Sequence, residues 1–218
     1  MLATNVRLIR ADETFSEEFP RNSVSPKANK RVQSRTTLSL LLLGDDSSEQ
    51  KWSEGSCYLQ VQAKGFVDPY GTTIPAQEAI QIMKAVYGVG MAEGFFKNKY
   101  EYFPTSPQYK VYVHQRYTKG WNLEEIFKLS EEYTKTLASL EINEAFANSS
   151  EEELAGLMRY FAKKTKTIWE SPKGMPLINA AQWLFDSYSG HDDLLRFVRT
   201  MIALEILLGF VDNHLSHR

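Results

Sequence analysis

Histidine is the side chain best suited to acid–base or metal chemistry near neutral pH, and this chain holds four: His114, His191, His214 and His217. None belongs to an HExxH pair, and Cys57 is the only cysteine, which excludes an internal disulfide and a thiolate metal cluster. His214 and His217 are close enough in sequence to share a metal ion, but a polar chain end is the favoured interpretation. The sequence therefore predicts neither a metal site nor a cofactor.

Two polar residues of a predicted strand share one face. His114 and Arg116 are two positions apart, so together they would offer a titratable group and a cation to an anion. Nearby tyrosines and lysines, such as Tyr109 and Lys110, would suit base stacking on a basic sheet. The favoured alternative is an ordinary strand whose exposed polar face lies beside Tyr112.

A second basic group lies on a predicted helix and consists of Arg159, Lys163, Lys164 and Lys166. Such a cluster is usually a solvated helix face, and contact with phosphate is the alternative. Together with the strand pair above, these four residues are the nucleic-acid-binding candidates that the sequence offers.

Three glycines, Gly88, Gly90 and Gly94, invite comparison with a phosphate-binding loop. Their spacing is not GxGxxG, and no predicted strand leads into them. A helix whose end is softened by glycine is therefore the favoured interpretation.

Glu205 is unusual because the residues three and four positions away on either side are apolar. A carboxylate in such a helix must be paired or must face a cleft. We expect Glu205 to be largely buried, with Arg196, Arg199 or Trp183 as its hydrogen-bond donor.

The elements that would position these residues divide the chain into two regions. Alternating or apolar runs predict strands over residues 36–43, 56–64 and 109–117, and a helix starts at Pro75. Residues 13–35, rich in Ser, Pro and charge, predict a long loop.

From Asn122 onward the apolar spacing is helical. Asn122 and Glu125 resemble a capping box, and a second helix starts at Ser150, where the acids at 151–153 suit its positive N-terminal dipole. Two further helices are expected, one over residues 177–188 and one that begins at Asp192 and ends at Val211. The predicted fold class is α+β, mainly helical, with a strand-containing region over 1–118 and a helical bundle over 119–218.

The composition and the net charge argue against some classes of function. A formal net charge of -2 gives no global footprint for nucleic acid. No apolar run approaches the roughly 20 residues that a membrane span needs, and the first residues lack the apolar core of a secretion signal. We expect a cytoplasmic protein.

Three segments of the last two predicted helices resemble the helix pair of Apea-like HEPN domains, the higher eukaryote and prokaryote nucleotide-binding helical domains. They are Ala-Gln-Trp-Leu-Phe-Asp-Ser over 181–187, Asp-Leu-Leu-Arg over 193–196, and Ala-Leu-Glu-Ile-Leu-Leu-Gly over 203–209. The resemblance implies a helical bundle that often dimerises, needs no metal, and is frequently linked to RNA cleavage in toxin–antitoxin or antiphage systems.

Cleavage in that family depends on an Arg followed after four to six residues by a His. No Arg–His pair in this sequence has that spacing, and the family would be expected to continue beyond Gly209 into the helices that carry the motif. The resemblance therefore implies a module that binds RNA or a protein without turnover. The alternatives are a scaffold protein with no nucleic-acid role, and a metal-independent endoribonuclease that requires a missing segment or subunit.

The last predicted helix also indicates association. Its apolar residues surround much of its circumference: Leu194, Leu195, Val198, Met201, Ile202, Ile206, Leu207, Leu208 and Phe210. Such a helix needs cover on more than one side. We expect a homodimer, or a complex with another chain, built on the helix from Asp192 to Val211.

Overall fold

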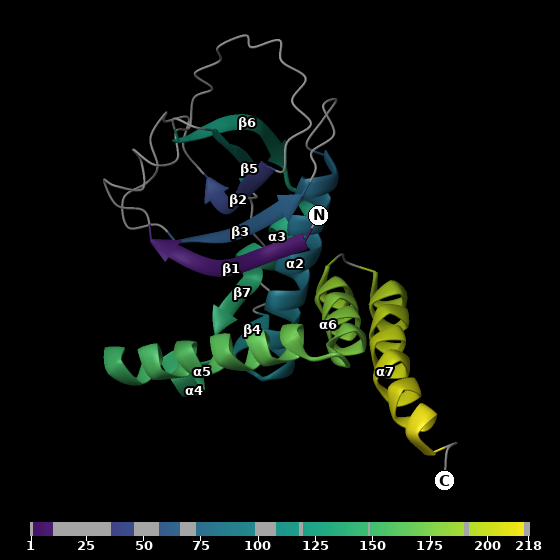
Figure 1. Ribbon diagram of the computed structural model, residues 1–218. Helices are drawn as coiled ribbons and strands as arrows, with labels where there is room; N and C mark the ends of the chain where they lie inside the picture. Colours follow the sequence, from purple (N-terminus) through teal and green to yellow (C-terminus); the bar gives the residue numbers. More distant parts are fainter. Residues whose placement is uncertain are drawn as a thin grey trace. The chain divides into compact units, whose positions relative to one another are not determined.

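A computed structural model describes residues 2–10, 36–45, 57–65, 73–98, 108–117, 120–147, 149–189 and 192–215 (Figure 1). The loop predicted over 13–35 lies outside them. Contacts divide the chain into two compact units. The first, the sheet unit, comprises Met1–Ile80 and Pro107–Glu131; the second, the helical unit, comprises Gln81–Ser106 and Glu132–Arg218. The domain boundary expected between residues 118 and 119 stays a prediction.

Five antiparallel strands make the sheet of the first unit, in the order β1-β3-β2-β5-β6. They are β1 Leu2–Arg10, β2 Thr36–Asp45, β3 Cys57–Gly65, β5 Gln108–Tyr117 and β6 Gly120–Lys128. Strands β2, β3 and β5 confirm the three predicted ones, whereas β1 was not predicted. Because β1 and β6 are both edge strands, each gains ladder hydrogen bonds on one side only.

Strand β6 corrects the helix that the sequence predicted from Asn122. Gly120 adopts a φ of 126°, which favours glycine, and from there the chain folds back along β5. Trp121 and Leu123 are both buried, which is the period of a strand, and a register irregularity beside Glu124 ends this alternation. The cross-strand pairing outweighs a helical pattern that was only local.

One polar face of the sheet that was expected to be exposed is in fact buried. Tyr112 and His114 on β5 are almost completely covered, so the interpretation of an exposed polar face beside Tyr112 is wrong. Gln60 on β3 is also fully buried. Arg116 is exposed.

The remaining elements are two short paired strands, β4 Phe96–Asn98 and β7 Leu140–Ile142, and the helices α2 Thr73–Ala92, α3 Glu131–Ser139, α4 Glu144–Ala147, α5 Glu151–Glu170, α6 Gly174–Tyr188 and α7 Asp193–Leu215. These elements confirm the α+β, mainly helical class. Among the described helices, none is long and apolar enough to cross a membrane.

Helix α2 continues through two of the glycines that were expected to blur its end. A Cβ atom at Gly88 would collide with the carbonyl oxygen of Ala181 on α6, and one at Gly90 would collide with the ring of Phe96. Both glycines therefore allow close packing inside the helical unit. Gly94, with a φ of 69°, follows the helix end, as expected of a residue that terminates a helix.

Aromatic rings form much of the helical unit's core. Phe95 stacks on Phe161 of α5 with ring centroids 5.4 Å apart, and on Phe146 at 5.5 Å. Helix α5 begins at a full capping box, in which the Ser150 side chain accepts a hydrogen bond from the Glu153 N–H and the Glu153 carboxylate accepts one from the Ser150 N–H. The predicted start of this helix is confirmed.

Candidate association surface

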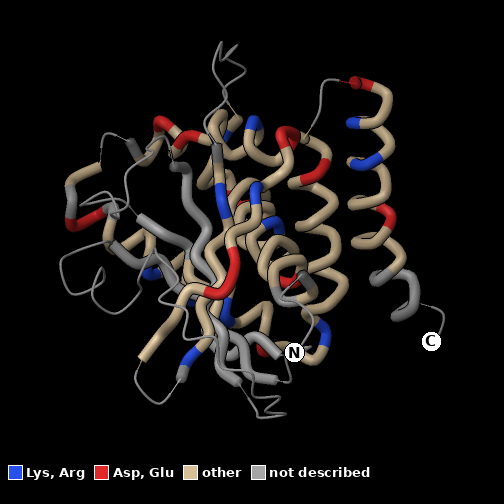
Figure 2. Tube along the Cα trace, turned by 90° about the horizontal axis from the view of Figure 1, so that it is seen from above, with Lys and Arg blue, Asp and Glu red and all other residues tan. Residues whose placement is uncertain are grey.

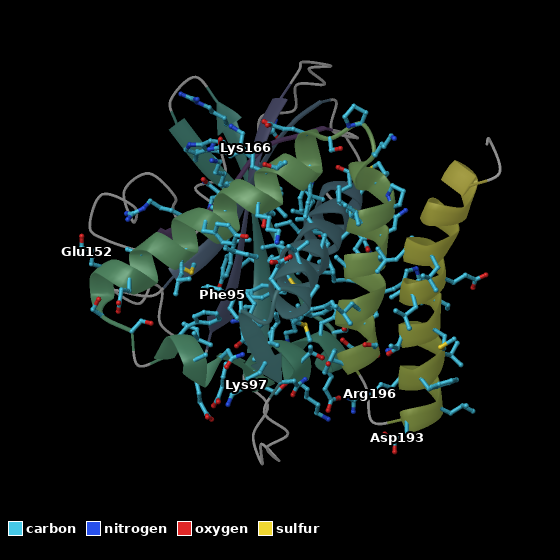
Figure 3. The ribbon with its side chains drawn as sticks, turned by 90° about the horizontal axis from the view of Figure 1, so that it is seen from below. Phe95, Lys97, Glu152, Lys166, Asp193 and Arg196 are labelled. Atoms are coloured by element: carbon cyan, nitrogen blue, oxygen red, sulfur yellow. The ribbon has the colours of Figure 1, made fainter. Side chains whose placement is uncertain are left out.

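Helix α7 packs against α6 along one side, as Figures 1 and 3 both show. Ala203 is the most deeply buried described residue of α7, and Arg199 and Thr200 are half-buried. Positions 199, 200 and 203 therefore mark the covered side of the helix. A small residue at 203 suits close helix–helix contact.

The other side of α7 carries exposed apolar side chains at heptad spacing. They follow one another by three and four residues in turn, and their exposed fractions are 72% for Leu194, 62% for Phe197, 48% for Met201, 45% for Leu204 and 64% for Leu208. We call these five residues the α7 seam. Alternating steps of three and four are the spacing of the apolar positions in a coiled coil.

One further apolar residue widens the seam, because Val198 is exposed and lies four residues from Leu194 and three from Met201 on the helix surface. Leu195 and Leu207 are also exposed, but each is four residues from a covered-side position, Arg199 or Ala203. If a large side chain presents roughly 150–200 Å² when free, the five seam residues and Val198 leave on the order of 500–670 Å² of apolar surface exposed. A patch above a few hundred Å² is typical of an interaction site rather than of ordinary surface.

The first turn of α7 is fixed by its own cap and by an arginine. The Asp192 carboxylate accepts hydrogen bonds from the N–H groups of Leu194 and Leu195 at 2.9 and 3.0 Å. One turn further, Arg199 donates to the backbone carbonyl oxygens of Asp186 and Ser189 at the end of α6. A cation there complements the negative end of the α6 dipole.

Arg199 also belongs to a group of four charged residues that joins four helices of the helical unit. It pairs with Glu132 of α3 at 2.7 Å, while Lys84 of α2 pairs with Asp186 of α6 at 2.6 Å. We call Lys84, Glu132, Asp186 and Arg199 the charged network. Its two cations balance the charge of its two carboxylates.

The Lys84–Asp186 pair is the buried part of the charged network. The side chain of Lys84 is 6% exposed and that of Asp186 is 16% exposed, and the Lys84 ammonium lies 5.3 Å from the centre of the Tyr133 ring. Burial raises the pKa of Asp186, and the hydrogen bond from Lys84 opposes that rise. Asp186 Oδ1 is buried and accepts no hydrogen bond from the described residues.

The charged network fixes how α7 lies against α6 and α3. Lys84 bonds α2 to Asp186 near the end of α6, Arg199 bonds α7 to the carbonyl oxygen of Asp186, and Glu132 of α3 pairs with Arg199. Thr136 of α3 adds hydrogen bonds from its hydroxyl to Ser189 Oγ at 3.0 Å and to the Tyr188 carbonyl oxygen at 3.4 Å. This polar anchor holds the covered side of α7 in place and so determines which side faces outward.

The expectation for Glu205 is wrong, because its side chain is exposed. Its proposed donors are used elsewhere: Arg199 bonds the charged network, and the guanidinium of Arg196 lies 5.0 Å from the centre of the Tyr188 ring. Trp183 is 36% exposed on α6. The apolar neighbours of Glu205 belong largely to the exposed seam, which provides no cover.

Two of the four basic residues on α5 are paired with acids. Lys164 bonds Glu93 and Lys166 lies 3.7 Å from Glu170, whereas Arg159 and Lys163 are exposed. The exposed ring of Tyr160, which the sequence did not single out, lies 5.7 Å from the Lys164 ammonium. The cluster therefore offers fewer available cations than its sequence implies.

The basic strand pair belongs to the other unit. His114 is buried, and the Arg116 guanidinium lies 5.8 Å from the centre of the Trp121 ring. His191 and His217 lie outside the described residues, and the side chain of His214 is not described. Within the described part of the chain, no three His, Cys, Asp or Glu side chains gather as a metal site would need.

Sequence reasoning missed the charged network, although a signal for it existed. Lys84 interrupts the apolar run of α2 between Met83 and Ala85, and Asp186 directly follows the buried Phe185. The argument that singled out Glu205 applies equally to both residues. What the sequence lacks is any sign that these two positions face each other across 102 residues.

No family model, curated protein or solved structure matches the chain. The resemblance to HEPN domains accordingly stays a prediction carried by its own residues. The segments over 181–187 and 203–209 lie on α6 and α7, which pack against each other.

Proposed function

We propose that the chain is a HEPN-like helical module that acts by association, with two copies joined through the outer side of α7 and with no turnover of its own. The exposed α7 seam is the observation that carries this proposal. A role in antiphage defence or in a toxin–antitoxin pair follows from the resemblance alone.

The size of the exposed surface supports a second copy as the partner. About 600 Å² from each of two copies would bury roughly 1,200 Å², which is the lower end of a standard stable interface. Most soluble oligomers are homo-oligomers in which the same patch of both subunits meets across a two-fold axis. A seam at heptad spacing can meet its own copy in this way, because each apolar side chain finds an apolar partner.

The polar residues give a reason for assigning no turnover. His114 is buried in the sheet unit, and the charged network is occupied with fixing α7. General acid–base cleavage of RNA needs a proton acceptor within reach of the substrate and a cation for the phosphate. Neither His114 nor the charged network therefore offers that pair of groups to a substrate.

Light scattering coupled to size exclusion tests the association over a range of concentrations. We expect a dimer for the native chain and a folded monomer for the variant Leu194→Glu/Leu208→Glu, because two buried carboxylates per copy would oppose the interface. The matched control is Met175→Glu on α6, a residue of similar exposure that lies off the seam. A native chain that stays monomeric, or a double variant that stays dimeric, would contradict the proposal.

RNA binding by α5 is the second candidate function, and it is favoured by the exposed Tyr160 and by the basic residues of this helix. Between Arg159 and Trp169 the helix carries four cations and no acid, and the exposed Tyr160 ring could stack on a base. Labelled single-stranded RNA should then bind with a strong dependence on salt. Tyr160→Ala should weaken binding, whereas Met175→Ala should not; equal binding by both variants would remove this candidate.

A further inference from the structure

We infer that Met201 is an oxidation site that controls the association of two copies: a peroxide converts it to methionine sulfoxide and so releases the dimer, and the dimer in turn shields it. This inference rests on the proposed function, because Met201 belongs to the α7 seam. It adds a modification site and a means of regulating that surface. The place of Met201 in the seam, its exposure and the chemistry of its neighbours single it out.

The six methionines of the chain differ sharply in exposure. Met83 is buried, Met91 and Met158 are half-buried, and among the described side chains only Met175 and Met201 are exposed, at 59% and 48%. A dissolved oxidant therefore reaches these two sulfur atoms most readily. Met175 lies on α6 and off the seam, so Met201 is the exposed methionine whose oxidation alters the proposed interface.

Met201 lies in the middle of the α7 seam. Leu194 precedes it by seven residues and Leu208 follows it by seven, so at 1.5 Å per residue each end of the seam is about 10 Å away. A partner that covers the seam therefore covers Met201 away from the rim, whichever way the partner's helix runs. In a free copy the same side chain is open to solvent.

Oxidation adds one oxygen atom to the thioether sulfur. A sulfur lone pair attacks one oxygen of hydrogen peroxide, the O–O bond breaks, and the sulfur is oxidised by two electrons while the peroxide is reduced to water. The reaction converts a flexible apolar side chain into a polar one whose oxygen accepts hydrogen bonds. Methionine sulfoxide reductases reverse the change, so the modification can be switched off again.

The side chains around Met201 offer no donor to a sulfoxide oxygen. Figure 2 shows that α7 carries no charged residue between Arg199 and Glu205. Of the residues three and four positions from Met201, Glu205 only accepts hydrogen bonds when ionised, and the others are apolar: Phe197, Val198 and Leu204. A second copy brings the same seam residues, so each sulfoxide in the dimer would be buried without a partner. The dissociation constant should therefore rise at least about 10-fold.

Hydrogen peroxide, removed before measurement, tests this control by light scattering over a range of concentrations. The native chain, with sulfoxide at Met201 verified by peptide mass spectrometry, should dimerise at least about 10-fold more weakly, and a sulfoxide reductase should restore the dimer. Met201→Leu keeps the volume and the apolar character, so it should dimerise before and after the same treatment. This variant retains the other five methionines and Cys57, so oxidation elsewhere acts equally in both chains. Met175→Leu should lose the dimer on oxidation as the native chain does.

The rate of oxidation gives an independent readout. Met201 should be oxidised more slowly above the dissociation constant of the dimer than below it, because coupling between two events is reciprocal, whereas Met175 should react at the same rate throughout. An oxidised native chain that dimerises as tightly as the untreated one, or a Met201→Leu variant weakened by peroxide to the same extent, would overturn the inference while the association stands. A chain that is monomeric at all concentrations before oxidation would overturn both proposals.

Discussion

Breaking the Lys84–Asp186 pair should destabilise the protein far more than replacing both residues together. At 2.6 Å and an effective dielectric constant of about 20, the gross attraction is roughly 6 kcal/mol. Desolvation of two charges that are 6% and 16% exposed offsets most of that attraction. The pair therefore stabilises little in net terms, but either charge left alone remains buried without its partner.

We expect Lys84→Met to lower the free energy of unfolding by about 3–5 kcal/mol, because Asp186 would stay buried beside Glu132. Asp186→Asn should cost less, about 1–3 kcal/mol, since the amide oxygen still accepts a hydrogen bond from Lys84 and the Tyr133 ring still faces the ammonium. Lys84→Met/Asp186→Leu should come within about 1 kcal/mol of the native chain.

Urea unfolding of the native chain, Lys84→Met, Asp186→Leu and the double variant measures the coupling between the two sites. The exposed pair Lys166 and Glu170, 3.7 Å apart on α5, is the matched control, and its coupling should stay below about 0.5 kcal/mol. Additive effects of Lys84→Met and Asp186→Leu would show that the two charges do not depend on each other, and would refute the role given to the charged network.

Three further outcomes follow from single contacts. Burial raises the pKa of Asp186 above its ordinary value of 3.8. The contribution of this carboxyl group to the free energy of unfolding is therefore full below pH 3.8 and is lost as the pH rises through the folded-state pKa. In urea titrations, the stability advantage of the native chain over Asp186→Asn should shrink from about pH 4 upward. Gly88→Ala should cost about 3 kcal/mol because its Cβ meets the Ala181 backbone, whereas Gly156→Ala, with open space around it, should stabilise by up to about 1 kcal/mol in thermal melts. Ser150→Ala should cost about 1 kcal/mol through loss of the α5 cap, and an unchanged melting temperature would contradict the cap's role.

Elements with a strong local signal could be predicted from the sequence. Ser150 and the acids in the first turn of α5 specify its start, and α6 begins at Gly174, three residues before the expected start and with the expected end at Tyr188. Strands β3 and β5 alternate clearly enough to be recognised without their partners. In each case the physical cause acts within a few residues of the chain.

Elements whose structure depends on residues far away in the sequence could not be predicted. Strand β6 has helical spacing, but its residues pair with β5, and that pairing decides its structure. Gly88 suggested a helix end because glycine disfavours helices. Glycine is needed at this position because the backbone of α6, more than 90 residues later in the sequence, packs against it. Both errors arise because local propensity is weaker than long-range packing.

Glu205 and Asp186 show where the rule that a buried charge must be paired succeeds and where it fails. Both carboxylates interrupt apolar runs, and the requirement that a buried charge be paired applies to both. Asp186 is covered and paired with Lys84, whereas Glu205 is exposed because its neighbours form the seam instead of a core. The sequence marks α7 as apolar on more than one side, but it cannot say which side α6 covers. If two copies join along the seam, Glu205 lies at the rim of that interface, where its carboxylate can stay solvated while the apolar contact of the seam decides affinity.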